Sequence, residues 1–78
     1  ILQAGQRIAT SVAFSPDGTL LASGHNNARI VIWDVESGEK IATLNGHSDP
    51  VTSVAFSPNG ALLASGGYDR SVILWEVR

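Results

Sequence analysis

The sequence predicts an all-β fold in which antiparallel sheets repeat along the chain, and three observations support this. Residues 1–36 and 43–78 align at a constant offset of 42 residues, with 16 of the 36 aligned positions identical. A fixed period of this length is typical of stacked-repeat proteins. The apolar segments are short and are separated by Gly, Pro, Asn and Asp turn signals. Gly or Pro also interrupts every long window, which argues against helices.

Each repeat opens with a strand in which apolar and small side chains alternate. Segment 10–15 (TSVAFS) is expected to place Val12 and Phe14 on one face of a strand. The SPDG sequence at 15–18 is expected to turn the chain, because proline presets φ and glycine accepts a positive φ. Segments 20–24, 30–35 and 40–44 follow as three further strands.

The second copy repeats this order with strands expected at 51–57, 62–66 and 71–77. Segment 30–35 (IVIWDV) and its copy are almost continuously apolar, which is the pattern of a strand covered on both faces. Two repeats alone leave such strands partly uncovered, so the sequence points to a further packing partner.

Composition excludes several classes of site. The 78 residues include no cysteine, only two histidines, five Lys or Arg and seven Asp or Glu. We therefore expect no disulfide, no metal site and no cofactor. The balanced, scattered charge predicts neither a nucleic-acid partner nor a membrane partner. Without a visible signal peptide or membrane-spanning segment, the default expectation for localisation is cytoplasmic.

The two copies resemble a known family. A Gly-His pair at 46–47, SVAFSP followed by DG or NG, LLASG, a loop aspartate and a closing WD or WE are similar to the WD-repeat β-propeller family. The resemblance covers the whole chain and implies four-stranded blades around a central channel. It also implies that residues 9–44 form a first blade and residues 51–77 the inner three strands of a second. Residues 1–3 would be an outer strand donated to a neighbouring blade.

The resemblance further implies a buried hydrogen-bond chain from Trp75 through Ser65 and His47 to Asp69. The chemistry fits, because an indole only donates, a hydroxyl does both and a carboxylate only accepts. A Ser-His-Asp catalytic triad is the alternative, but the sequence supplies neither an exposed nucleophile nor an oxyanion hole. We therefore expect a structural network and no catalytic residues.

The first copy departs from this pattern. Its aligned positions are Gly5, Ser23, Asn27 and Trp33, so both the histidine and the aspartate are absent. The expectation is that Ser23 and Trp33 pair, with Asn27 as a further candidate, and that this blade lacks a complete network.

In the resembled family, partners dock on the face that bears the loops before the first strand and between the second and third. His25 is expected in one of these loops. The alternative is that the residues of these loops are ordinary solvated surface residues with no partner. The candidate partner-binding residues are Arg7, Asn26, Asp49, Tyr68 and Arg70.

A propeller needs about four to eight blades to close, and this chain holds two. We therefore expect a non-catalytic scaffold that self-assembles head to tail into a closed homo-oligomeric ring with the potential to bind proteins or peptides. Blades shaped for a ring of seven turn by about 51°, closer to the roughly 45° of eight than to the 60° of six. Mass action favours the smaller ring of three chains, but on balance a tetramer of eight blades is favoured over a trimer of six. The alternative is a piece of a longer natural WD-repeat protein, and whether the chain is natural, excised or engineered stays open.

Overall fold

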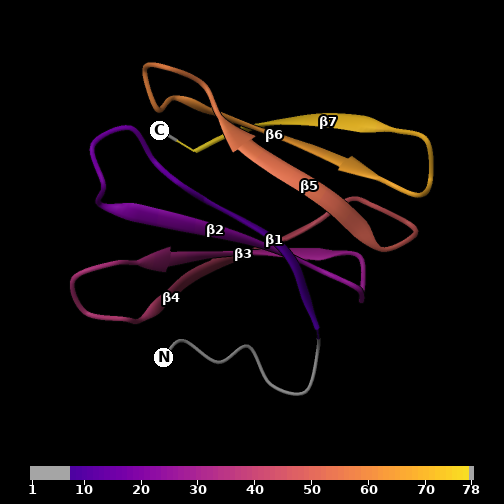
Figure 1. The fold of residues 1–78 in the computed structure, drawn as a ribbon, viewed down its shortest axis with the longest axis horizontal. Helices are drawn as coiled ribbons and strands as arrows, with labels where there is room; N and C mark the ends of the chain where they lie inside the picture. The colour runs from indigo at the N-terminus through magenta and orange to yellow at the C-terminus, as the bar shows by residue number, and fades with distance from the viewer. Residues whose placement is uncertain (1–7, 78) are drawn as a thin grey trace.

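Residues 8–77, the part of the chain described by the computed structural model, form seven β-strands in two antiparallel sheets (Figure 1). The strands are β1 (Ala9–Phe14), β2 (Leu20–His25), β3 (Arg29–Asp34), β4 (Lys40–Asn45), β5 (Val51–Phe56), β6 (Leu62–Gly67) and β7 (Val72–Glu76). The first sheet has the order β1-β2-β3-β4 and the second the order β5-β6-β7. The all-β, antiparallel prediction is confirmed. Residues 1–3, expected to supply an outer strand, lie outside the described residues.

The two copies use the same turn chemistry between their first and second strands. Gly18 N–H donates to the Ser15 carbonyl at 2.9 Å, and Ser15 Oγ donates to Asp17 Oδ1 at 2.7 Å. Residues 57–60 repeat both bonds, with an asparagine in place of the aspartate. Glycine is needed at the fourth position because φ there is 76° in the first copy and 74° in the second.

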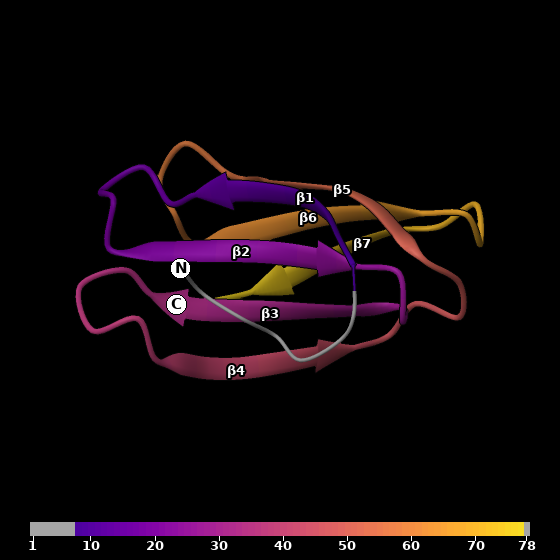
Figure 2. The same ribbon diagram turned by 60° about the horizontal axis from the view of Figure 1, so that its bottom comes forward.

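The two sheets pack face to face, with β1 and β5 adjacent (Figures 1 and 2). The buried side chains at the junction come from both sheets: Ala22, Ile30, Ile32, Val51, Val54 and Leu63. Gly24 permits the close approach, because a Cβ at this position would lie 2.6 Å from Val51 Cγ1. The hydroxyl of Thr10 also bonds the Val51 carbonyl across the junction.

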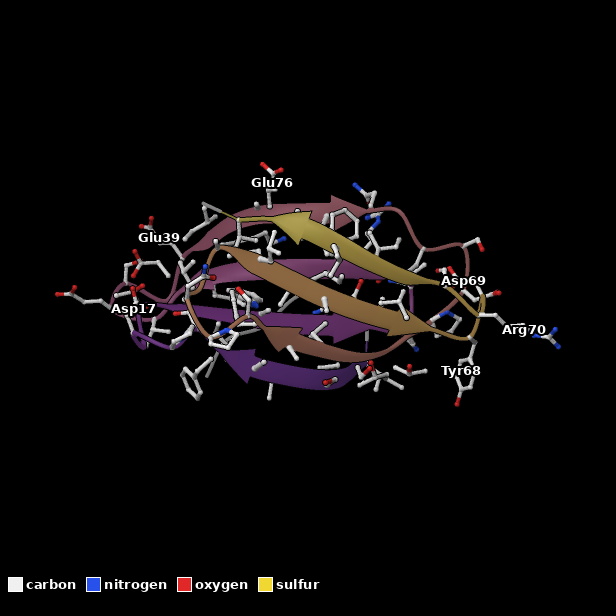
Figure 3. The ribbon with its side chains drawn as sticks, turned by 90° about the horizontal axis from the view of Figure 1, so that it is seen from above. Asp17, Glu39, Tyr68, Asp69, Arg70 and Glu76 are labelled. Atoms are coloured by element: carbon white, nitrogen blue, oxygen red, sulfur yellow. The ribbon has the colours of Figure 1, made fainter. Side chains whose placement is uncertain are left out.

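The β2–β3 turn, the β4–β5 link and the β6–β7 turn lie at one end of the sheets, because the strands alternate in direction. Figure 3 shows Tyr68, Asp69 and Arg70 at this end, with Asp17 and Glu39 at the opposite one. We call the first of these ends the loop face. Within residues 8–77 there is no helix that could cross a membrane.

Candidate functional site: two buried hydrogen-bond chains beneath the loop face

The second sheet contains a hydrogen-bond chain that connects four side chains from separate elements. Trp75 Nε1 of β7 donates to Ser65 Oγ of β6 at 2.8 Å. Ser65 Oγ lies 2.7 Å from Nε2 of His47 in the β4–β5 link, and His47 Nδ1 lies 3.0 Å from Asp69 Oδ2. Since the indole can only donate and the carboxylate can only accept, every proton in the chain points toward Asp69. In this assignment Nδ1 of His47 carries the proton that the Asp69 carboxylate accepts.

Asp69 ties the link and the turn together. Its carboxylate also accepts from the Ser48 backbone N–H at 2.9 Å, the Ser71 backbone N–H at 3.1 Å and Ser71 Oγ at 2.6 Å. The Ser71 hydroxyl is the main reason that the pKa of Asp69 lies well below its usual range, and the Ser48 N–H adds to it. A carboxylate with several donors stays ionised, so this end of the chain is a fixed negative charge.

The Ser65–His47–Asp69 arrangement has the connectivity of a catalytic triad but not its accessibility. Ser65 is only 1% exposed, and its oxygen already accepts the Trp75 indole N–H. A nucleophile must reach a substrate carbonyl and lie beside an oxyanion hole. A serine sealed in this way can hold β6 and β7 together but cannot attack a substrate.

The first sheet contains a second chain that the sequence comparison missed. Trp33 Nε1 donates to Ser23 Oγ at 2.9 Å, and Ser23 Oγ lies 2.8 Å from His25 Nε2. The expectation that this copy has no histidine in its network is wrong. His25 was assigned to an exposed loop, yet it is the last residue of β2 and only 4% exposed. Residues two apart on a strand share a face, which is why His25 reaches Ser23.

The two copies exchange histidine between two positions. Gly67 occupies the place of His25 in the second copy, and a Cβ there would lie 2.8 Å from His47 Nδ1. Each serine therefore has one imidazole beside it. In the second copy this is His47 of the β4–β5 link, and in the first copy it is His25 of β2. The signal was available in the sequence, where the aligned pair at 25 and 67 reads His and Gly while the pair at 5 and 47 reads Gly and His.

The chain in the first sheet stops at the histidine. His25 Nδ1 is buried and has no hydrogen-bond partner within residues 8–77. Burial lowers the pKa of His25, the positive charge of Lys40 lowers it further, and the Ile8 carbonyl opposes the change. Asn27, aligned with Asp69, accepts only the Arg29 backbone N–H among the bonds seen, at 3.3 Å.

The candidate partner-binding residues divide between the turns and the link of the loop face. Tyr68 and Arg70 lie in the β6–β7 turn, and Figure 3 shows both side chains pointing outward. Asp49 is an exposed residue of the β4–β5 link. Asn26 is exposed in the β2–β3 turn, where its backbone N–H donates to the Ile8 carbonyl at 3.0 Å. Arg7 lies outside the described residues.

No group of three or more His, Cys, Asp or Glu side chains in the described part of the chain could hold a metal ion. His47 already has a partner on each nitrogen, and His25 and His47 lie in different sheets' networks. The described residues thus form two packed sheets, and a Trp–Ser–His hydrogen-bond chain connects the strands of each sheet.

Comparison with known proteins gives two family matches and many structural ones. The family described as "WD domain, G-beta repeat" matches residues 38–76, and "Anaphase-promoting complex subunit 4 WD40 domain" matches residues 2–54. The structure is similar to "Structure of U3-55K", with a TM-score of 0.91 and 32% identity. It is also similar to "Crystal structure of RRP9 WD40 repeats", with a TM-score of 0.92 and 32% identity. Each match covers 96% of this chain but only 25% and 24% of those chains, respectively.

Known protein sequences also match parts of this chain. A stretch of 43 residues, 55% of this chain, is 58% identical to "Probable serine/threonine-protein kinase PkwA" of Thermomonospora curvata. A stretch of 47 residues, 60% of this chain, is 43% identical to "Pre-mRNA-processing factor 19" of Oryza sativa subsp. japonica. The matched stretches make up only 6% and 9% of those two proteins.

Proposed function

Because the chain belongs to the WD-repeat family, we propose that it is a non-catalytic β-propeller scaffold that closes into a ring by head-to-tail association of two-blade chains. In these terms the first sheet is a complete blade and the second sheet is a blade of three strands. The observation that carries the proposal is a mismatch in burial between the two copies.

Positions 42 residues apart have the same apolar character but opposite exposure. Ile30 and Ile32 of β3 are 0% and 4% exposed because they pack against the second sheet, whereas the aligned Val72 and Leu74 of β7 are 75% and 66% exposed. The second sheet therefore presents to solvent the same kind of surface that the first sheet uses at the internal junction.

The opposite surface is exposed on the first sheet. Val12 of β1 is 60% exposed, while the aligned Val54 of β5 is 8% exposed at the junction. Phe14 is exposed as well, and its counterpart Phe56 is partly buried against the core. The exposed surface of the second sheet could therefore pack on the exposed surface of the first sheet of another copy, just as the two sheets pack within one chain. Such a heterologous interface can be repeated from copy to copy until a ring closes.

A strand edge adds a second contact. β7 is an edge of the second sheet, so one row of its backbone groups has no neighbouring strand among the described residues. An apolar recess of about 280 Å³ lies between β4 and the end of β7, lined in part by Ile41, Leu44 and Val77. Residues 1–3 of a second copy, aligned with part of β4, would continue the sheet there and cover the recess. Four chains would give eight blades and three would give six, with four favoured by the smaller change in packing angle.

The ring would present its loop face as the surface for protein or peptide partners. Tyr68 is 74% exposed and Arg70 is exposed beside it. Tyrosine and arginine are enriched among the residues that carry binding energy in protein interfaces. Asn26 and Asp49 lie at the same end, and Arg7 would join them. No cofactor, nucleic acid or membrane enters this proposal.

Matched surface variants test the association. Leu74→Lys places a charge on the open surface of the second sheet, and Val12→Lys does the same on the first. Tyr68→Lys changes an equally exposed residue on a turn that lies outside both surfaces. We expect sedimentation equilibrium to give weaker association for the first two variants and unchanged association for Tyr68→Lys, with all three retaining the β-sheet circular dichroism of the parent. Equal association in all four proteins would refute the proposed interface.

The alternative is that the chain is a piece of a longer WD-repeat protein, and the small share of each relative that it covers favours this reading. The same complementary surfaces would then meet neighbouring blades of one polypeptide. Under this alternative the isolated chain is a monomer or an aggregate of mixed size, and Leu74→Lys improves its solubility without altering a defined oligomer.

A further inference from the structure

A small polar recess of about 60 Å³ opens on the first sheet where the side chains of β2, β3 and β4 converge. It is lined by His25, Asn27, Arg29, Val31, Lys40 and Thr43. Arg29 and Lys40 form no ion pair with any residue from 8 to 77, and no acidic side chain lines the recess. Two uncompensated positive charges therefore face a space several times larger than one water molecule requires.

The buried histidine at this recess lacks the acceptor that its counterpart has. In the second sheet, His47 Nδ1 donates to the Asp69 carboxylate, which completes the chain that begins at Trp75. In the first sheet Trp33 Nε1 donates to Ser23 Oγ, and we assign the Ser23 hydroxyl as the donor to His25 Nε2, as in the second sheet. This assignment leaves a buried Nδ1–H that has no acceptor at hydrogen-bond distance among the described residues. An unsatisfied buried donor costs free energy comparable to a lost hydrogen bond.

We propose that this recess binds a small oxyanion, a phosphate or a carboxylate group, whose oxygen accepts the His25 Nδ1–H while Arg29 and Lys40 neutralise its charge. The oxyanion takes the part that the Asp69 carboxylate plays in the second sheet. Arg29 supplies a planar donor pair suited to two oxygens of one anion, and Lys40 supplies a point charge. The Asn27 amide and the Thr43 hydroxyl add uncharged donors.

Two opposing influences act on the His25 imidazole. Burial and the positive charge of Lys40 of β4 disfavour its charged form, whereas the Ile8 carbonyl, which also accepts the Asn26 N–H at 3.0 Å, favours it. A bound anion adds the one negative charge that this environment lacks. Because every lining residue belongs to the first sheet, the site does not depend on ring formation.

Titration of inorganic phosphate against the ¹⁵N-labelled imidazoles tests the proposal, at pH 7 and at ionic strength held constant with chloride. We expect the His25 Nδ1 resonance to move saturably and the His47 resonances to stay in place. Arg29→Gln is expected to weaken phosphate binding at least about tenfold. Arg70→Gln removes the same charge from the β6–β7 turn and is expected to change it by less than about twofold.

A protein-dilution series without phosphate separates the two sources of the oxyanion. If the occupant is a carboxylate of another copy, the His25 resonance moves on dilution and phosphate competes with the protein contact. If the occupant is a free anion, dilution has no effect. The proposal is overturned if His25 shows no saturable response in either series, or if Arg29→Gln responds to phosphate as the parent does.

Discussion

The close approach of the two sheets at Gly24 gives a sharp test of how the blades pack. A Cβ at this position would lie 2.6 Å from Val51 Cγ1, 3.2 Å from Val51 Cβ and 3.5 Å from Val54 Cγ1. Val51 is fully buried, so it has no free space to move into. Gly24→Ala should therefore push the sheets apart at the centre of the junction.

The magnitude follows from two opposing effects. Inserting a methyl group into a well-packed core costs about 1–3 kcal/mol. Replacing glycine by alanine where the backbone angles allow it returns about 0.4–1 kcal/mol by restricting the unfolded chain. Neither Gly24 nor the aligned Gly66 has a positive φ, so the second effect is common to both. We expect Gly24→Ala to lower the free energy of unfolding by about 1–2 kcal/mol.

Gly66→Ala is the matched control. The nearest atom to a Cβ there is Ser53 Oγ at 3.3 Å, the end of an exposed side chain that can rotate away. Its unfolding free energy should change by less than about 0.5 kcal/mol in either direction. Urea denaturation of the parent and both variants at one protein concentration measures the difference. Equal losses at the two glycines would refute the packing of Val51 and Val54 against the first sheet.

Three further outcomes are expected. Asp69→Ala should lower the melting temperature more than Asn27→Ala, because Asp69 accepts from His47, Ser48 and Ser71 while, within residues 8–77, Asn27 accepts only from the Arg29 N–H. Equal losses in thermal melts would mean that the His47–Asp69 bond is too solvated to matter. Because the pKa of His25 is lowered in the folded chain, the unfolded chain binds a proton at this imidazole more readily. In chloride buffers the free energy of unfolding should therefore fall as pH drops from about 6.5 toward the lower pKa of the folded state. The fall should be smaller in His25→Gln, and the same pH profile in that variant as in the parent would contradict the lowered pKa of His25. Deleting residues 1–3 should promote dissociation on dilution if they supply the outer strand of a neighbouring blade; a truncated chain that keeps its mass and melting temperature would exclude the strand exchange.

Much of the fold follows from local chemistry that can be read in the chain. The SPDG and SPNG turns, the alternation in 10–15 and the apolar 30–35 segment predict the strands to within a residue or so of their observed ends. These features depend on short-range geometry, so they need no knowledge of what lies opposite. The four members of the second sheet's network could be named because each occupies a position that the resembled family specifies.

What could not be predicted depends on contacts between distant segments. His25 was placed in a loop because polar residues follow it, but the strand continues to include it and its imidazole turns inward to Ser23. The histidine that the first copy lacks at position 5 is replaced from another backbone position. A position-by-position alignment cannot detect such a replacement unless the compensating glycine is noticed as well. The recess beside His25 was missed for the same reason.

The mass of the native particle is the most direct test of ring closure. Each chain has a mass of 8.2 kDa and brings two sheets whose outer surfaces expose Val12, Val72 and Leu74. Native mass spectrometry of the 78-residue chain should give one discrete species, four times 8.2 kDa in preference to three times, that persists over a range of protein concentrations. A monomer, a dimer or a broad distribution of sizes would contradict closure into a ring and would favour a piece of a longer propeller.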